Sequence, residues 1–141
     1  MQVRSLLPEG WKKPSGYSNG TLVQGAADFV FVAGQIAWNA NQELVGPGDF
    51  VAQFEQALAN VVAVIHAGGG RTDGLTQVTV YVTDKQAYLA NLREIGRVWR
   101  EQVGKIYPSM ALVQVADLLE EGAMVEIQAV AALQHLAHGP D

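Results

Sequence analysis

The sequence contains no cysteine and few charged residues. Without cysteine the chain has no disulfide, no thiolate nucleophile and no cysteine-based metal site. Charged residues make up 16% of the 141 residues and hydrophobic residues 49%, which is a low share of charge for a soluble monomer. A single domain of this length has little room to hide so much apolar surface, so we expect part of it to lie in subunit contacts.

A basic cluster is also missing. Nine Lys and Arg residues against fourteen Asp and Glu residues give a formal net charge of −5, which argues against a phosphate-backbone partner. No apolar run approaches ~18 residues, and the N-terminal apolar run is too short for a signal peptide. We therefore predict no nucleic-acid partner, no membrane partner and a cytoplasmic location.

Histidines are few, and their spacing does not indicate a metal site. His66 stands alone, and His135 and His138 lie in the polar C-terminal end. The triple glycine at 68–70 does not indicate a phosphate loop, because it follows a predicted helix instead of preceding one. We predict no metal and no cofactor.

The length favours a single domain over residues 1–141. Two prolines and three glycines punctuate residues 8–20, so we predict an irregular N-terminal arm over residues 1–20. Residues 134–141 form a polar tail that we expect to fray.

Apolar periodicity predicts an α+β fold. The apolar runs predict five strands, over residues 21–24, 29–32, 75–82, 107–116 and 124–133. The turn signal at 25–28 predicts that the first two strands form a hairpin. The acidic turn at 120–122 predicts that the last two strands are neighbours.

Two predicted helices separate these strands. Asp49 is a good N-cap for an apolar stripe that ends at Gly68. Thr83 and Gln86 fit a capping box that opens a second helix, which ends at Gly104. The resulting order of elements suits a mixed sheet with both helices on one face.

The other face of that sheet is predicted to be uncovered and of mixed polarity. It would carry Gln77, Thr79, Tyr81, Met124, Glu126 and Gln128. A carboxylate in the middle of a strand is costly unless it is wet or paired. Glu126 therefore marks either a site or a strand face open to solvent, and a subunit interface with a wet pocket fits the whole face.

Two further positions carry a functional and a structural alternative. Tyr17 lies before the first predicted strand, where it either packs against the body or forms the wall of a pocket. Gly34 directly follows a buried strand, where it either lets a ligand or a backbone approach closely or marks a bulge.

The chain resembles the Rid/YjgF family, also labelled L-PSP endoribonucleases, over essentially its whole length. The matching motifs are Tyr17, residues 31–36, Gln53, residues 57–58 and 60–61, residues 67–68, residues 78–82 with Asp84, Pro108, residues 113–116 and residues 125–127. The resemblance implies a chorismate-mutase-like (YjgF-type) fold, with a mixed six-stranded-type sheet and two helices packed on one face. It also implies a homotrimer with small-molecule pockets at the subunit clefts. One branch of the family hydrolyses reactive enamines and imines to keto acids and ammonia.

Carried over residue by residue, the resemblance gives a catalytic residue and a set of ligand-binding positions. Glu126 takes the role of orienting or deprotonating the attacking water. The ligand-binding positions are Tyr17, Ala33, Gly34, Gln35, Met110 and Ala111.

This sequence departs from the family pattern at the substrate anchor. The hydrolytic branch has Pro-x-Arg-Ser/Thr where this chain has Pro108-Ser109-Met110-Ala111. The serine expected before Gly34 is Ala33. Loss of the arginine removes a contact to a substrate carboxylate worth about 2–3 kcal/mol, so we expect simple imino acids to bind poorly.

Two functions of different classes follow. In the first, the protein is a deaminase-type hydrolase of a less acidic enamine, imine or related metabolite. In the second, it is a non-catalytic trimer that binds or scavenges a small metabolite. A replacement for the missing arginine would separate them, and the candidates are Arg4, Lys12, Lys13, Arg93, Arg97, Arg100 and Lys105. RNA cleavage is a poor third reading for an acidic chain.

Overall fold

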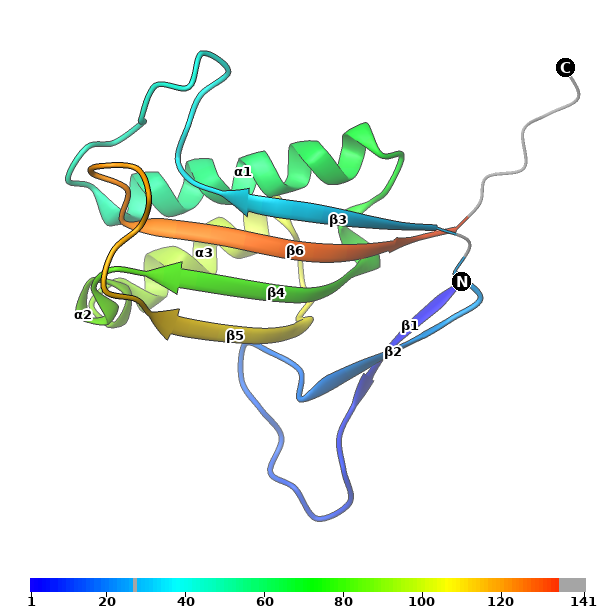
Figure 1. Cartoon of the computed structure of the whole chain (residues 1–141). Helices are drawn as coiled ribbons and strands as arrows, with labels where there is room; N and C mark the ends of the chain where they lie inside the picture. Colours follow the sequence, from blue (N-terminus) through cyan, green and yellow to red (C-terminus); the bar gives the residue numbers. More distant parts are fainter. Residues whose placement is uncertain (27, 135–141) are drawn as a thin grey trace, which may run out of the picture.

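The computed structural model describes residues 1–26 and 28–134. It shows an α+β fold, as predicted, built on a four-stranded sheet with helices along one face (Figure 1). The strand order is β3 (Asp28–Gln35), β6 (Val125–Leu133), β4 (Leu75–Val82) and β5 (Ser109–Gln114). The six strands do not form one continuous sheet, because β1 and β2 form a separate pair.

The N-terminal arm is not irregular throughout, contrary to the prediction for residues 1–20. Residues Gln2–Leu6 form β1, which pairs antiparallel with β2 (Gly20–Gln24). The predicted hairpin between β2 and β3 is therefore wrong, because β2 pairs with the preceding strand, β1. The sequence did not predict β1, because four of its five residues are exposed and the strand therefore lacks an alternation of buried and exposed positions. The predicted tail lies outside the described residues except for Gln134.

The last two strands are not neighbours, again contrary to the prediction. β4 lies between them, parallel to β5 and antiparallel to β6. A parallel pair needs a long crossover, which the helical segment between β4 and β5 supplies. The loop after β5 then crosses over β4 to reach β6.

Helix α1 (Phe50–Ala67) follows the prediction closely. The Asp49 carboxylate caps it by accepting from the backbone N–H of Ala52 at 3.1 Å, and Gly68 ends it. By length and composition α1 is the one helix in the described residues that could cross a membrane. Its apolar side is instead buried against β6 and β3, as in the core helix of a globular domain.

The second predicted helix is broken into two. Helix α2 (Lys85–Leu89) is capped by Asp84 and not by Thr83, and helix α3 (Leu92–Gln102) follows after a break. The Asn91 side chain donates to the carbonyl of Ala87 at 2.6 Å and so competes with helical backbone bonds at the break. A short 3-10 turn, η1 (Thr72–Gly74), precedes β4.

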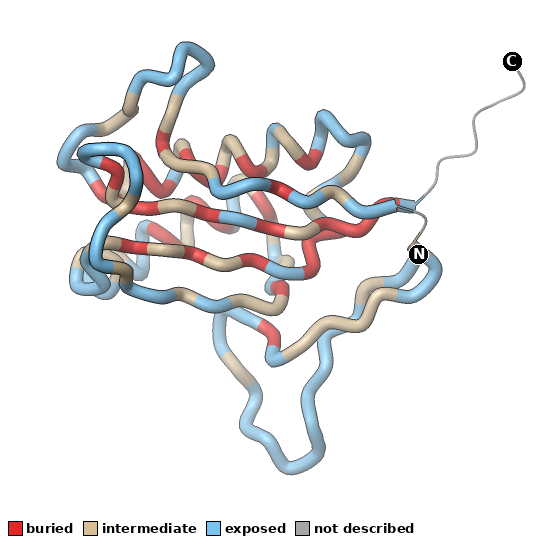
Figure 2. The backbone as a smooth tube through the Cα atoms, viewed as in Figure 1, coloured by how far each residue is buried: buried red, intermediate tan, exposed pale blue. Residues whose placement is uncertain are grey.

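Burial alternates along β4 and β6, as Figure 2 shows. Val78, Val80 and Val82 on β4 point to the helices and are buried, together with the odd residues of β6 from Val125. The opposite side is called the open face here. It carries Phe29, Phe31, Gln77, Thr79, Tyr81, Ala111, Val113, Glu126, Gln128 and Val130. Met124, predicted there, instead packs partly against the core.

Candidate functional site

Glu126 lies in a cleft at one end of the open face. The carboxylate cleft is a cavity of about 400 Å³, lined by Gly34, Gln35, Ile36, Trp38, Gln42, Leu119, Glu120 and Glu126. Three predicted site residues, Gly34, Gln35 and Glu126, are thus brought together from β3 and β6. Among the described residues, the Glu126 carboxylate has no hydrogen-bond or ion-pair partner in the chain.

A β-bulge shapes the contact between β3 and β6. Val32 pairs with Ala129 but Gln35 pairs with Ile127, so one extra residue is inserted on β3. At the bulge, a Cβ added to Gly34 would lie 2.8 Å from Cδ of Glu126 and closer still to Oε1. Gly34 therefore lies at a bulge, which is the structural alternative, and its neighbour is the Glu126 side chain; the approach of a ligand stays a prediction.

Ala33, where the resemblance leads us to expect a serine, precedes Gly34 on β3 and lines neither this cleft nor the other pockets described. Its carbonyl accepts a hydrogen bond from the Gln35 side-chain amide at 3.0 Å. The Gln35 side chain is therefore held against its own strand, next to the Glu126 carboxylate.

Polar residues of α1 hold the walls of the carboxylate cleft. Asn60 donates to the carbonyls of Ile36 and Trp38 at 3.0 and 2.8 Å. Gln56 donates to Asn60 Oδ1 at 2.9 Å and so orients that amide. Because these bonds come from the core helix, the segment after Gly34 has a fixed path.

Gln53 does the same for the strand that carries Glu126. Its amide is fully buried, donates to the carbonyls of Gly46 and Gly122 and accepts from the backbone N–H of Met124 at 2.8 Å. One buried side chain therefore joins two loops and the start of β6, two residues before Glu126.

Gln42 adds a strained backbone to the rim of the cleft. It is the one non-glycine residue with positive φ, at 58°, in the part of the chain that the structure describes. Asn39 stabilises the turn by accepting from the backbone N–H groups of Asn41 and Glu43. Such strain is typical of functional loops.

Three other predicted residues, Tyr17, Met110 and Ala111, line a second pocket at the opposite end of β4. The tyrosine pocket has a volume of about 320 Å³ and is lined by Tyr17, Ser18, Asn19, Gln77, Val78, Thr79, Ser109, Met110 and Ala111. Tyr17 is exposed and lines this pocket, and its predicted role in binding a ligand stays a prediction.

Hydrogen bonds tie the arm that carries Tyr17 to the sheet. The backbone N–H of Ser18 donates to the carbonyl of Pro108 at 2.9 Å, and its hydroxyl donates to the carbonyl of Tyr107. Thr21 donates to the carbonyl of Thr76 at 2.9 Å. Tyr17 therefore lies at a fixed position beside β5.

Within one chain the two pockets do not meet. They share no lining residue. On β4, Gln77 pairs with Ser109 of the tyrosine pocket, whereas Tyr81 pairs with Glu126. Four residues of extended strand between them correspond to about 13 Å. Within one chain, Tyr17 and Glu126 therefore line separate pockets.

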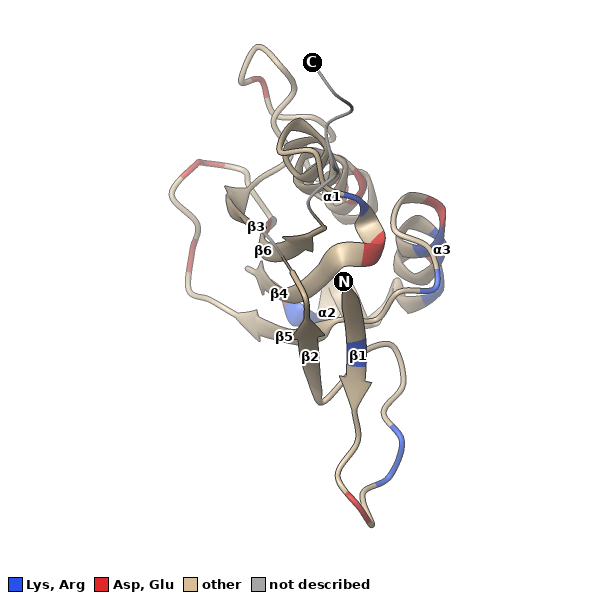
Figure 3. Ribbon diagram, turned by 90° about the vertical axis from the view of Figure 1, so that its right-hand side faces the viewer, with Lys and Arg blue, Asp and Glu red and all other residues tan. Residues whose placement is uncertain are grey.

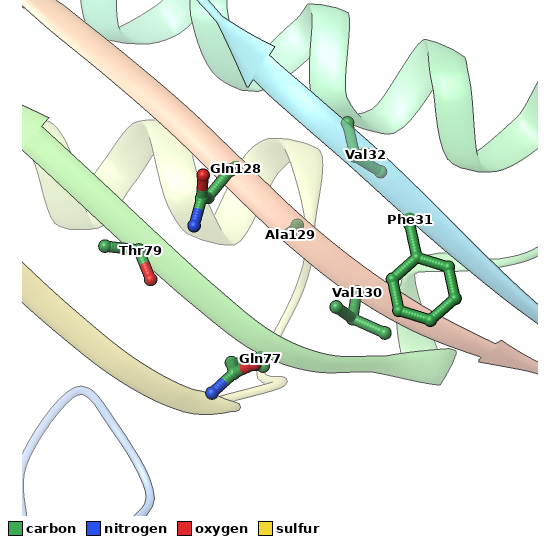
Figure 4. Close-up of a pocket in the computed structure, with 7 residues that line it drawn as sticks. All are labelled: Phe31, Val32, Gln77, Thr79, Gln128, Ala129 and Val130. Atoms are coloured by element: carbon green, nitrogen blue, oxygen red, sulfur yellow. The ribbon is translucent and has the colours of Figure 1, made fainter.

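Between the two pockets the open face is slightly hollowed. Figure 4 shows Gln77, Thr79 and Gln128 on neighbouring strands around this hollow, with Phe31 and Val130 at one end. Phe31 is 76% exposed and contacts Phe29, with 6.5 Å between their ring centroids. An exposed aromatic pair on a sheet face is an apolar surface available for a partner.

Charge is sparse around both pockets. The loop from β5 to β6 carries Asp117, Glu120 and Glu121, seen as its red segments in Figure 3. No Lys or Arg lines either pocket within residues 1–26 and 28–134. The same part of the chain holds no group of His, Asp and Glu that could bind a metal. Of the cations considered as replacements for the missing arginine, Arg100 is the one that lines a pocket together with Met110.

Sequence reasoning missed several residues of these pockets. Trp38, Gln42 and Leu119 lie in loops, and Leu119 is fully exposed. The sequence carried two signals for these loops: Asn39, which is typical of a turn, and Leu119, a long apolar residue in an acidic loop.

Comparison with known proteins gives consistent matches. Residues 12–133 match the protein family described as Endoribonuclease L-PSP. A RutC family protein of Pyrococcus horikoshii is 29% identical over 126 residues, which are 89% of this chain and 94% of that protein.

Solved structures match over nearly the whole chain. A protein of unknown function of the conserved Rid protein family from Yersinia pestis has 32% identity and a TM-score of 0.82, covering 94% of this chain and all of its own. The structure of TdcF from E. coli with bound serine has 29% identity and a TM-score of 0.62, covering 87% of this chain and 91% of its own.

Proposed function

The chain belongs to the Rid/YjgF family, also described as the endoribonuclease L-PSP family, and from this premise we propose that it hydrolyses a reactive enamine or imine. The family includes enamine and imine deaminases. The observation that carries the proposal is the Glu126 carboxylate held against Gly34 in a cleft, with no partner among the described residues of its own chain.

Glu126 would act as the general base on water. The carboxylate takes a proton from a water molecule, and the water oxygen bonds to the carbon of the C=N group. The C=N π electrons pass to nitrogen, which takes the proton back from Glu126 to give a neutral carbinolamine. Glu126 then transfers the hydroxyl proton to nitrogen, the C–N bond breaks, ammonia leaves and a carbonyl forms. One imine and one water give one carbonyl compound and one ammonia.

The complete site would lie between two copies in a homotrimer. The carboxylate cleft and the tyrosine pocket are half-sites of one chain, and the open face between them exposes Phe29 and Phe31. Pairing of open faces would bury these rings and join the cleft of one copy to the pocket of the next. We also propose a single domain over residues 1–141, and a cytoplasmic location.

The substrate is expected to be less acidic than a simple imino acid. Met110 and Ala111 stand where the family anchor would place a cation and a hydroxyl, and neither can bind a carboxylate. TdcF is a relative whose structure contains serine, which is a small amino acid. The tyrosine pocket of this chain offers the Tyr17 hydroxyl and neutral polar side chains beside Met110 and Ala111.

A non-catalytic binding protein is the second candidate function. The absence of a cation around Glu126 and Tyr17, among the residues described, favours it, because no Lys or Arg lining these pockets would stabilise a developing negative charge. RNA cleavage has less support, since the pockets lack basic residues to bind phosphates.

Ammonia release decides between these two functions. The wild-type protein should accelerate hydrolysis of a neutral imine, such as benzophenone imine, more than that of 2-aminoacrylate, and Glu126→Gln should abolish both. Met110→Arg with Ala111→Ser should reverse the preference. Binding of the imine without ammonia release above the Glu126→Gln background would support the binding protein and overturn the hydrolase.

A further inference from the structure

The carboxylate cleft is acidic and contains no compensating cation. Glu120 and Glu126 both line it, and no Lys or Arg does so in the part of the chain that the structure describes. Asp117 and Glu121 lie on the same loop as Glu120 and add to the negative charge at this end of the sheet (Figure 3). A cleft lined by one sign of charge focuses its potential and attracts ligands of the opposite charge.

Ion pairs within the chain do not neutralise the two carboxylates of the cleft. The ion pairs that the structure shows involve Arg71 and Arg97, and neither of these residues lines the cleft. Within residues 1–26 and 28–134, the side chains of Glu120 and Glu126 make no ion pair and no hydrogen bond. Both carboxylates are therefore available to a ligand.

Apolar side chains form a second part of the wall. Ile36 and Trp38 are half-buried, and Leu119 is fully exposed on the loop beside Glu120. The Asn60 amide donates to the carbonyls of Ile36 and Trp38 at 3.0 and 2.8 Å, so this part of the wall is fixed. An indole also attracts cations, because the face of its ring is negative. The cleft therefore suits a cation that is attached to an apolar group.

The tyrosine pocket, as the second half-site, does not reverse this charge preference. Its lining consists of neutral side chains, with Met110 and Ala111 beside the Tyr17 hydroxyl. Neither half-site therefore offers a cation to a substrate carboxylate. A carboxylate near Glu120 and Glu126 would be repelled, whereas a protonated amine would be attracted.

We propose that the substrate of this site is an imine that carries a protonated amino group on an apolar frame, and that Glu120 binds this group. The inference rests on the proposed function, because it assigns the substrate class of the same site. The C=N carbon lies at Glu126 and the protonated amine at Glu120, with the apolar frame against Ile36, Trp38 and Leu119. Glu120 is then a specificity-determining residue and takes no part in proton transfer.

Three imines that differ in charge test the proposal. They are benzophenone imines with a 4-(dimethylamino)methyl, a 4-isobutyl or a 4-carboxymethyl group, which are cationic, neutral and anionic at about pH 7. The first two groups are isosteric, so the difference between them reports charge. Ammonia release gives kcat/KM for each imine, which is divided by the rate constant of its uncatalysed hydrolysis. We expect the cationic imine to exceed the neutral one by about five- to tenfold, and the anionic imine to be the poorest.

Two glutamate variants of one loop give the control. Glu120→Gln should bring the ratio between the cationic and the neutral imine close to one, because an amide does not pair with a protonated amine. Glu121→Gln removes the same charge from the neighbouring position, which does not line the cleft, and should keep the ratio to within about twofold. Circular dichroism of both variants checks that they fold.

Binding of compounds that cannot be hydrolysed separates this inference from the proposed function. Benzylamine, benzyl alcohol and benzoate carry the same three charges and have no C=N group. Calorimetry should show that benzylamine binds more tightly than benzyl alcohol and that benzoate binds most weakly. Glu120→Gln should remove the difference between the amine and the alcohol. This result without ammonia release from any imine would support the cation site and overturn the hydrolase.

Three results would overturn the inference and leave the hydrolase standing. The first is equal corrected kcat/KM for the cationic and the neutral imine, and the second is an unchanged ratio in folded Glu120→Gln. The third is faster hydrolysis of the anionic imine, which would show that a cation of a neighbouring copy faces the cleft. No ammonia release from any imine, together with no preference for benzylamine, would overturn both proposals.

Discussion

The side chain of Glu126 lies directly against the Cα of Gly34, so that a Cβ at position 34 would lie 2.8 Å from its carboxyl carbon. The two residues come from neighbouring strands, β6 and β3, at a bulge that inserts one residue on β3. The contact fixes where the carboxylate points. Any side chain introduced at position 34 would therefore displace the Glu126 carboxylate.

Gly34→Ala tests this contact. Gly34 does not have a positive φ, so alanine fits the backbone and the clash with Glu126 is the main effect. We expect a loss of about 1–3 kcal/mol in the free energy of unfolding. We expect turnover of benzophenone imine to fall about tenfold or more, because the displaced base is misaligned with its substrate. Ala33→Gly, at the neighbouring exposed position, should change both the free energy of unfolding and the turnover by less than Gly34→Ala does.

Gln53→Leu tests the buried amide that precedes Glu126. The substitution leaves the carbonyls of Gly46 and Gly122 and the N–H of Met124 without their partner. Buried polar groups without partners cost about 1–3 kcal/mol each, so we expect the free energy of unfolding to fall by about 3 kcal/mol or more. Chemical denaturation measures it. Gln102→Leu removes one exposed hydrogen bond and should cost far less.

How far the sequence predicts the fold depends on whether the signal is local. The stripe from Asp49 to Gly68 and the alternation around Glu126 are local, and both elements lie where they were predicted. Strand neighbours are not local. The turn at 120–122 suggested that β5 and β6 pair, but β4 lies between them because the crossover helices place it there.

The candidate site shows the same division. Gly34, Gln35 and Glu126 were predicted together and share a cleft, and Tyr17, Met110 and Ala111 share another. No pattern in one sequence shows that these groups lie at opposite ends of β4. Arg100 and Met110 line one pocket because of how α3 lies over the sheet, which the sequence alone does not reveal.

Alkaline pH should destabilise the protein through Tyr88. Burial raises the pKa of this phenol in the folded state above its unfolded value of about 10. Its contribution to stability is fully present below the unfolded pKa and is lost as pH rises through the folded one. The free energy of unfolding of the wild type should therefore fall relative to Tyr88→Phe as the pH rises above about 10, the unfolded pKa. Parallel pH dependences for the two proteins would show that Tyr88 does not contribute.

Phe31→Asp tests the assembly through the open face. Phe31 is exposed in the single chain, and a carboxylate there would have to be buried if open faces pair. Sedimentation equilibrium should show a trimer for the wild type and a shift toward species near 15.1 kDa for the variant. Leu89→Asp places the same charge at an exposed apolar residue of α2 and should leave the assembly intact. A wild-type monomer at micromolar concentration would contradict the shared site.

Subunit complementation tests the central claim, that one site combines Glu126 of one copy with Tyr17 of another. Glu126→Gln and Tyr17→Ala should each be nearly inactive in releasing ammonia from benzophenone imine. If the two variants are unfolded together and refolded in equal amounts, random assembly gives about a quarter of the sites both native residues. We predict recovery of about a quarter of wild-type turnover in the mixture. Turnover no higher than that of the separate variants would contradict a site shared between copies.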